Sequence, residues 1–82
     1  MPPDVVYGVV LFPSVSHCMR AESLLLAAGL ACKLIPVPRE LSSDCGVALR
    51  FDWKDQRKVQ GILEQAGLEY ERITTVAQGH RG

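Results

Sequence analysis

The sequence predicts an α+β fold in which a four-stranded antiparallel sheet carries two helices on one face. The first observation is an internal repeat, because a shift of 38 residues superimposes GVVLFPS (8–14) on GVALRFD (46–52) and LLLAAGL (24–30) on ILEQAGL (62–68). The second is that each half contains an apolar run, an amphipathic helix and an extended segment, which gives the order β-α-β-β-α-β. Two such split β-α-β units joined by a short connection form the ferredoxin-like arrangement.

Both helices are predicted from apolar residues that recur at positions i, i+3, i+4 and i+7. In the first half these are Ala21, Leu24, Leu25 and Ala28, and in the second they are Val59, Ile62, Leu63 and Ala66. Ser14 and Asp52 stand where the N-caps belong, and Gly29 and Gly67 stand where the helices should stop.

Four strands are expected at about 5–12, 31–37, 46–51 and 69–76. The first and third should lie in the centre of the sheet and run antiparallel. In the third strand, Arg50 projects from the face opposite Val47, Leu49 and Phe51, where it could hold an anion or be solvated, and solvation is the favoured interpretation. The outer strands stay open, so a homodimer through an open sheet edge is an alternative state.

Length and charge indicate a single globular domain over residues 1–82, with an ordered core at about 5–76. Nine basic residues balance nine acidic residues, which argues against partners such as nucleic acid or an anionic membrane surface. No apolar run approaches the roughly 20 residues that span a bilayer. The N-terminus MPPDVVYG does not resemble a secretory signal, and we therefore expect a cytoplasmic protein.

The three cysteines Cys18, Cys32 and Cys45 are too few and too irregularly spaced for a disulfide framework. They also lack the paired C-x-x-C spacing of structural zinc, and we expect neither a metal site nor a cofactor. Cys18 falls on the packed helical stripe and Cys32 alternates with Leu34 in the second strand, so both are interpreted as structural. On context alone, Cys45 could either pack or react.

The predicted topology places Cys45 near the N-terminus of the first helix. The end of the first strand should lie beside Cys45 and Gly46, close to the start of the first helix and to the loop 38–44. A thiol that faces a helix N-terminus is stabilised as a thiolate, and Arg39 and His17 could add positive charge while Asp44 opposes it. Gly46 suggests close backbone approach or access for a reagent. His17 could accept a proton, but a solvated first-turn residue is the favoured interpretation.

Three segments together resemble a known family: VLFPSVSHCMRAESLLLAAGL, KLIPVPRELSSDCGVALRF and ILEQAGLEYERI. They are similar to the "putative selenium/sulfur carrier protein-like" family of small bacterial domains, over about residues 5–73. The most specific part of the resemblance is the pattern Pro38, Arg39, Ser42, Ser43, Cys45 and Gly46.

The resemblance implies that Cys45 receives a sulfur or selenium atom as a persulfide or selenopersulfide and passes it to an acceptor enzyme. The partners would be donor and acceptor proteins, and the domain would be a carrier rather than an enzyme. We expect Arg39, Ser42, Ser43, Gly46, Ser14 and His17 to support the thiol. Cys18, near the start of the first helix, could approach Cys45 and resolve a persulfide into a disulfide, which would make a redox switch.

Three other function classes stay open at this point. The chief alternative is a small-molecule-binding regulatory module of ferredoxin-like fold, and a structural interaction domain is the next. RNA binding is the weakest, because the strand GVALRF has a single aromatic residue where a stacking platform needs more.

Overall fold

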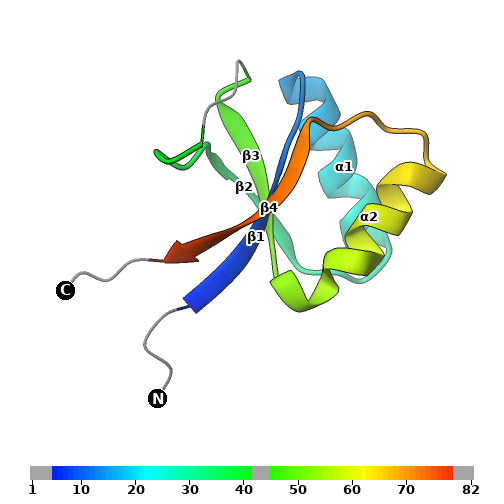
Figure 1. The fold of residues 1–82 in the computed structure, drawn as a ribbon. Coiled ribbons are helices and arrows are strands. Elements are labelled where there is room, and N and C mark those ends of the chain that lie inside the picture. The colour runs from blue at the N-terminus through cyan, green and yellow to red at the C-terminus, as the bar shows by residue number, and fades with distance from the viewer. Residues whose placement is uncertain (1–4, 42–44, 79–82) are drawn as a thin grey trace.

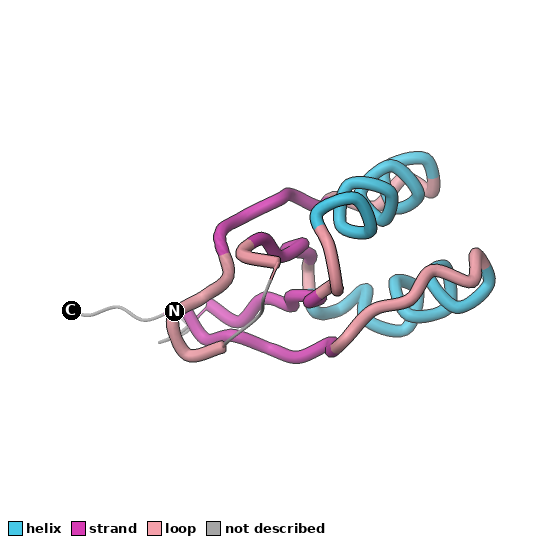
Figure 2. Tube along the Cα trace, turned by 90° about the horizontal axis from the view of Figure 1, so that it is seen from above, coloured by secondary structure: helices cyan, strands magenta, loops and turns pink. Residues whose placement is uncertain are grey.

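A computed structural model describes residues 5–41 and 45–78 of the chain (Figure 1). Its elements are β1 (Val5–Leu11), α1 (Val15–Ala27), β2 (Cys32–Pro36), β3 (Val47–Phe51), the 3-10 helix η1 (Trp53–Asp55), α2 (Gln56–Gln65) and β4 (Arg72–Gln78). Both helices lie on the same side of a four-stranded antiparallel sheet (Figure 2). The predicted α+β, ferredoxin-like fold is therefore confirmed.

The sheet has the strand order β2-β3-β1-β4, so β1 and β3 are central, as the repeat predicts. They run antiparallel, with Gly8 opposite Phe51 and Leu11 opposite Ala48. β4 pairs with β1 along all seven of its residues. The N-terminal end of β1 and the C-terminal end of β4 therefore project together beyond the rest of the sheet (Figure 1).

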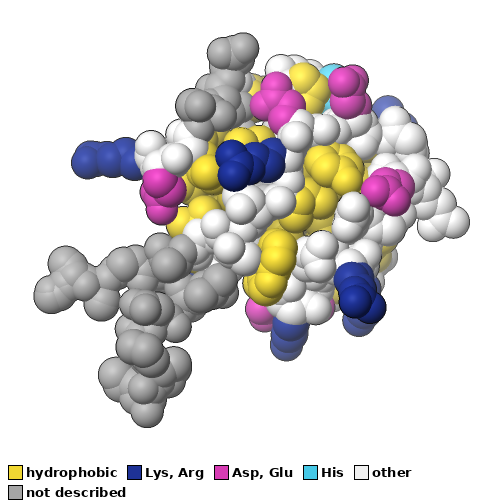
Figure 3. All heavy atoms as spheres, viewed as in Figure 1, with side chains coloured by type: hydrophobic (Ala, Val, Ile, Leu, Met, Phe, Trp, Pro, Cys, Tyr) yellow, Lys and Arg dark blue, Asp and Glu magenta, His cyan; other side chains and the backbone are white. Residues whose placement is uncertain are grey.

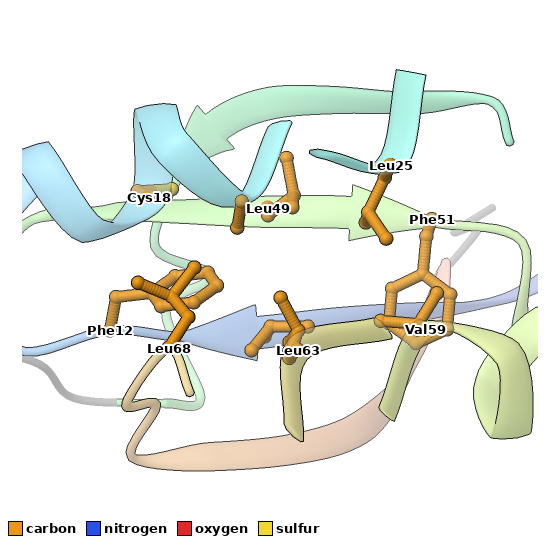
Figure 4. Packing of buried hydrophobic residues seen from close by; sticks show 10 residues of the cluster. Phe12, Cys18, Leu25, Leu49, Phe51, Val59, Leu63 and Leu68 are labelled. Atoms are coloured by element: carbon orange, nitrogen blue, oxygen red, sulfur yellow. The ribbon is translucent and has the colours of Figure 1, made fainter. Parts of the chain in front are cut away.

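The main core fills the space between the sheet and the two helices (Figure 4). Its fully buried members are Val10, Phe12, Cys18, Ala21, Leu25, Leu49, Val59 and Leu63. Gly8 is required here because a Cβ atom at this position would overlap the ring of Phe51 on the neighbouring strand. Ala21 and Leu25 of the predicted stripe in α1 and Val59 and Leu63 of that in α2 supply this core. The last predicted members, Ala28 and Ala66, are instead exposed at the C-caps, where each helix has ended.

A second apolar cluster lies on the opposite face of the sheet, hereafter the far face. Val9, Leu11, Ala48 and Val76 are buried there. Tyr7 and Ile35, together with Val37 and Leu41 from the segment after β2, pack against them. The sheet is therefore covered on both faces near the C-terminal end of β1, although the sequence led us to expect cover on the helical face alone.

The two helices begin differently although their sequences are related by the repeat. Ser14 caps α1 as predicted, because its Oγ accepts the backbone N–H of His17 at 3.3 Å. Asp52 instead precedes η1, where the Asp55 N–H donates to the Asp52 carbonyl at 2.8 Å, and its side chain makes no capping hydrogen bond. The helix α2 consequently begins at Gln56.

The C-terminal ends of the helices follow the prediction. Gly29 and Gly67 adopt φ of +83° and +67°, the left-handed conformation that terminates a helix at little cost for glycine. Leu30 and Leu68 then donate backbone hydrogen bonds back to Leu25 and Leu63. β4 begins at Arg72, three residues later than expected, because the chain first packs Leu68 and Tyr70 against the core.

The surface carries charges of both signs. In Figure 3, acidic and basic side chains are interspersed over the visible face, with apolar side chains between them. In the part of the chain that the structure describes, no helix has the length and apolar character needed to cross a bilayer.

Candidate functional site

Cys45 lies in the turn that leads directly into β3, and its side chain is half-buried. Gly46 follows with φ of +79°, and its carbonyl accepts the Val37 N–H at 3.2 Å. A Cβ atom at Gly46 would meet no atom of residues 5–41 or 45–78 within 4 Å. Glycine is therefore needed at this position for its backbone conformation.

Three parts of the chain come together at this end of the sheet. Leu11 at the end of β1 pairs with Ala48 near the start of β3, and Ser14 begins α1 three residues later. Burial is the main cause that raises the pKa of Cys18, and an electrostatic contribution from Cys45 adds to it, so Cys45 lies within electrostatic range of the first turn of α1. The topology thus brings the start of α1 and the turn before β3 to one edge.

Cys18 points from α1 into the core, at the end of the core that Phe12 and Leu68 also occupy (Figure 4). Burial raises its pKa to about 12, and the charges of Cys45, Glu22 and Cys32 add smaller effects in the same direction. At pH 7 the thiolate fraction of such a group is on the order of 1 in 100,000. The interpretation of Cys18 as a packed core residue is confirmed by its burial, and its raised pKa keeps the thiol protonated, which opposes nucleophilic attack by Cys18.

Cys32 begins β2 and is half-buried against the main core. Its Sγ lies 3.8 Å from the Glu22 carbonyl oxygen, to which the thiol donates a weak hydrogen bond. Burial raises the pKa of Cys32, and the carboxylate of Glu22 adds to the effect. The surroundings of Cys18 and Cys32 thus both favour the protonated thiol.

Ser14 and His17 form a pair at the start of α1. The Ser14 Oγ already accepts the His17 backbone N–H, and it lies 2.6 Å from the His17 Nδ1 atom. The hydroxyl therefore donates its own proton to Nδ1 when His17 is the neutral tautomer protonated on Nε2. This interaction commits Nδ1 to the helix cap, so any proton transfer with a neighbouring thiol would have to use Nε2.

Arg39 lies in a turn in which the Leu41 N–H donates to the Pro38 carbonyl at 2.9 Å. Its side chain is exposed, whereas Leu41 packs against the far face. The expected supporting residues Ser42 and Ser43, and the neighbouring Asp44, lie outside the described residues. Within 5–41 and 45–78, the His, Cys, Asp and Glu side chains form no group of three or more that could hold a metal ion.

Comparison with protein families gives one match. The family model described as "Putative Se/S carrier protein-like" matches residues 7–75, which is most of the chain. The chain belongs to this family. Searches of the curated proteins and of the solved structures found no significant match.

The matched region of this Se/S carrier-like domain contains all three cysteines and the whole of β2 and β3. Sequence reasoning identified the edge that carries Cys45 but missed Tyr7 and Lys33, which lie beside Arg50 at the other end of β3. Their proximity depends on strand register, because these three residues are far apart along the chain. Lys33 and Arg50 could be recognised as opposite one another only once the register between the adjacent strands β2 and β3 was known.

Proposed function

We propose that this domain carries a sulfur or selenium atom on Cys45 and passes it to an acceptor protein in the cytoplasm. Membership of the Se/S carrier-like family supports a carrier role. The observation that carries the assignment to Cys45 is the contrast among the three thiols. Cys18 is buried, and Cys32 packs against the main core and hydrogen-bonds to the Glu22 carbonyl of α1, whereas Cys45 lies in a turn at the sheet edge.

The proposed transfer needs no external oxidant. The Cys45 thiolate attacks the terminal sulfur of a donor persulfide, so that one S–S bond forms on Cys45 while the S–S bond in the donor breaks. The electron pair of the broken bond leaves with the donor thiolate. A thiolate on the acceptor then removes the terminal sulfur from Cys45 by the same displacement. Selenium follows the same path as a selenopersulfide.

The surroundings of Cys45 suit this chemistry in two respects. The turn before β3 leaves the thiol partly exposed, which a group that meets two proteins in succession requires. The neighbouring Cys18 keeps its proton at neutral pH, so it does not compete as a nucleophile for the bound atom. A persulfide on Cys45 would therefore persist long enough to be delivered.

Intact-mass spectrometry after incubation with a cysteine desulfurase and cysteine tests this proposal. The wild-type protein should gain one sulfur atom, and cyanide should remove it as thiocyanate. Cys45→Ser should gain none, whereas the matched control Cys32→Ser should load as the wild type does. Equal loading of the wild type and Cys45→Ser would refute the role of Cys45. Selenocysteine in place of cysteine, from which a desulfurase forms a selenopersulfide donor, tests whether Cys45 accepts selenium by the same displacement.

A further inference from the structure

An open pocket lies at the opposite end of β3 from Cys45. It has a volume of about 460 Å³, and Tyr7, Lys33 and Arg50 line it from three different strands. Cys32 and Asp52 also line it. This volume falls in the range of about 300–1,000 Å³ that is typical of small-molecule sites.

Two cations face each other in this pocket. Lys33 on β2 is directly opposite Arg50 on β3 in the antiparallel register, so both side chains emerge on the far face. Like charges directly opposite one another destabilise a sheet. The ion pair that the described residues form nearby joins Asp52 to Lys54 at 3.8 Å and involves neither of these cations. Lys33 and Arg50 therefore carry positive charge that a bound anion would neutralise.

Arg50 is held in position by an aromatic ring. Its guanidinium carbon lies 4.0 Å from the centroid of the Tyr7 ring, a cation–π geometry. This contact orients the planar guanidinium and does not neutralise its charge. The expectation that Arg50 is simply solvated is therefore wrong, because the side chain is half-buried over Tyr7. The N–H groups of an oriented guanidinium match the two oxygen atoms of an oxyanion.

We propose that this pocket binds an organic phosphate ester, with the phosphate group between Lys33 and Arg50. Asp52 also lines the pocket but is paired with Lys54, so the two cations leave a net positive charge that attracts a phosphate. A guanidinium and an ammonium together supply donors for its three terminal oxygens. An organic ester fits better than inorganic phosphate because the pocket is several times larger than a single oxyanion. Tyr7 and Ala31 also line the pocket, and they supply apolar surface that would contact the body of the ligand.

This site is separate from the carrier thiol. Arg50 follows Cys45 by five positions of mostly extended chain, which corresponds to on the order of 15 Å. A ligand between Lys33 and Arg50 therefore does not contact Cys45. The inference does not depend on the proposed carrier function, and either one can fail alone.

Isothermal titration calorimetry at low ionic strength tests the proposal with phenyl phosphate, inorganic phosphate and phenol. Phenyl phosphate should bind with a dissociation constant on the order of 1 mM or below, inorganic phosphate more weakly, and neutral phenol not measurably. No saturable heat with phenyl phosphate up to about 10 mM would overturn the assignment. Equal affinities for phenyl phosphate and phenol would refute recognition of the phosphate group. Equal affinities for phenyl phosphate and inorganic phosphate would refute the contribution of the organic group.

Two variants locate the site. Lys33→Gln and Arg50→Gln should each weaken phenyl phosphate binding at least tenfold, whereas Lys58→Gln on the exposed side of α2 removes the same charge and should leave it unchanged. Without ligand, Lys33→Gln should also raise Tm relative to the wild type, because it relieves the repulsion from Arg50. Unchanged affinity in Lys33→Gln would show that phenyl phosphate binds elsewhere and would refute the proposed site.

Discussion

The buried thiol of Cys18 should make the stability of the domain fall at alkaline pH. Its pKa is about 12 in the folded protein, against an ordinary value of 9.0. In the unfolded chain the thiol therefore ionises first, and above pH 9 this ionisation favours unfolding. Below pH 9 the thiol is protonated in both states, so it does not change the free energy of unfolding. As the pH rises from 9 toward 12, the free energy of unfolding falls by up to about 1.4 kcal/mol per pH unit.

The effect is large enough to isolate by substitution. Between about pH 8 and pH 10.5, ionisation of Cys18 should cost up to about 2 kcal/mol of the free energy of unfolding. Cys18→Ala removes the titrating group and leaves a small cavity, so it should lower stability by about 1 kcal/mol at pH 8. Its stability should then decline less steeply with pH than that of the wild type.

Urea denaturation followed by circular dichroism, under a phosphine reductant, measures both proteins at each pH. The difference in free energy of unfolding between the wild type and Cys18→Ala should shrink and then reverse as the pH rises. Cys32, which also has a raised pKa, is common to both proteins and cancels in this comparison. A constant difference across the pH range would refute the reasoning, because it would mean that Cys18 has the same acidity in the folded and unfolded states.

Three further substitutions test the backbone and capping arguments by urea denaturation. Ser14→Ala should lower stability by about 1 kcal/mol because it removes the cap of α1 and the partner of His17; an unchanged value would show that the cap contributes nothing. Gly46→Ala should cost about 1–2 kcal/mol because φ is +79°, and Gly46→Asn should cost less; the reverse order would contradict this. Gly8→Ala should cost at least about 1–3 kcal/mol through overlap with Phe51, and Phe51→Leu should reduce that cost when the two are combined.

The sequence predicted the topology well because two independent patterns agree. The 38-residue repeat gave the order of the elements, and the apolar spacing of each helix identified the residues that pack on the sheet. The start of α2 was less predictable. Ser14 and Asp52 occupy equivalent positions in the repeat, but the Asp55 N–H bonds to the Asp52 carbonyl and inserts a 3-10 turn, which side-chain identity alone does not reveal.

The candidate sites were predictable to different degrees. The place of Cys18 in the core followed from helical spacing, because a helix has a fixed period. The pocket at Tyr7, Lys33 and Arg50 could not be predicted in this way. A register shift of one residue between β2 and β3 would turn Lys33 to the other face of the sheet, and no local pattern determines that register.

The packing of the segment after β2 has a consequence for how a carrier of this shape would operate. Val37 and Leu41 are held on the far face, and the Val37 N–H bonds to Gly46, next to Cys45. The thiol is thus anchored through the start of β3 and is not mounted on a swinging arm that could shuttle between two distant active centres. Donor and acceptor would have to dock in turn on one side of the domain. The complexes with donor and with acceptor would then be mutually exclusive. An excess of donor would slow transfer of the bound atom to the acceptor, because the donor would occupy the surface on which the acceptor docks.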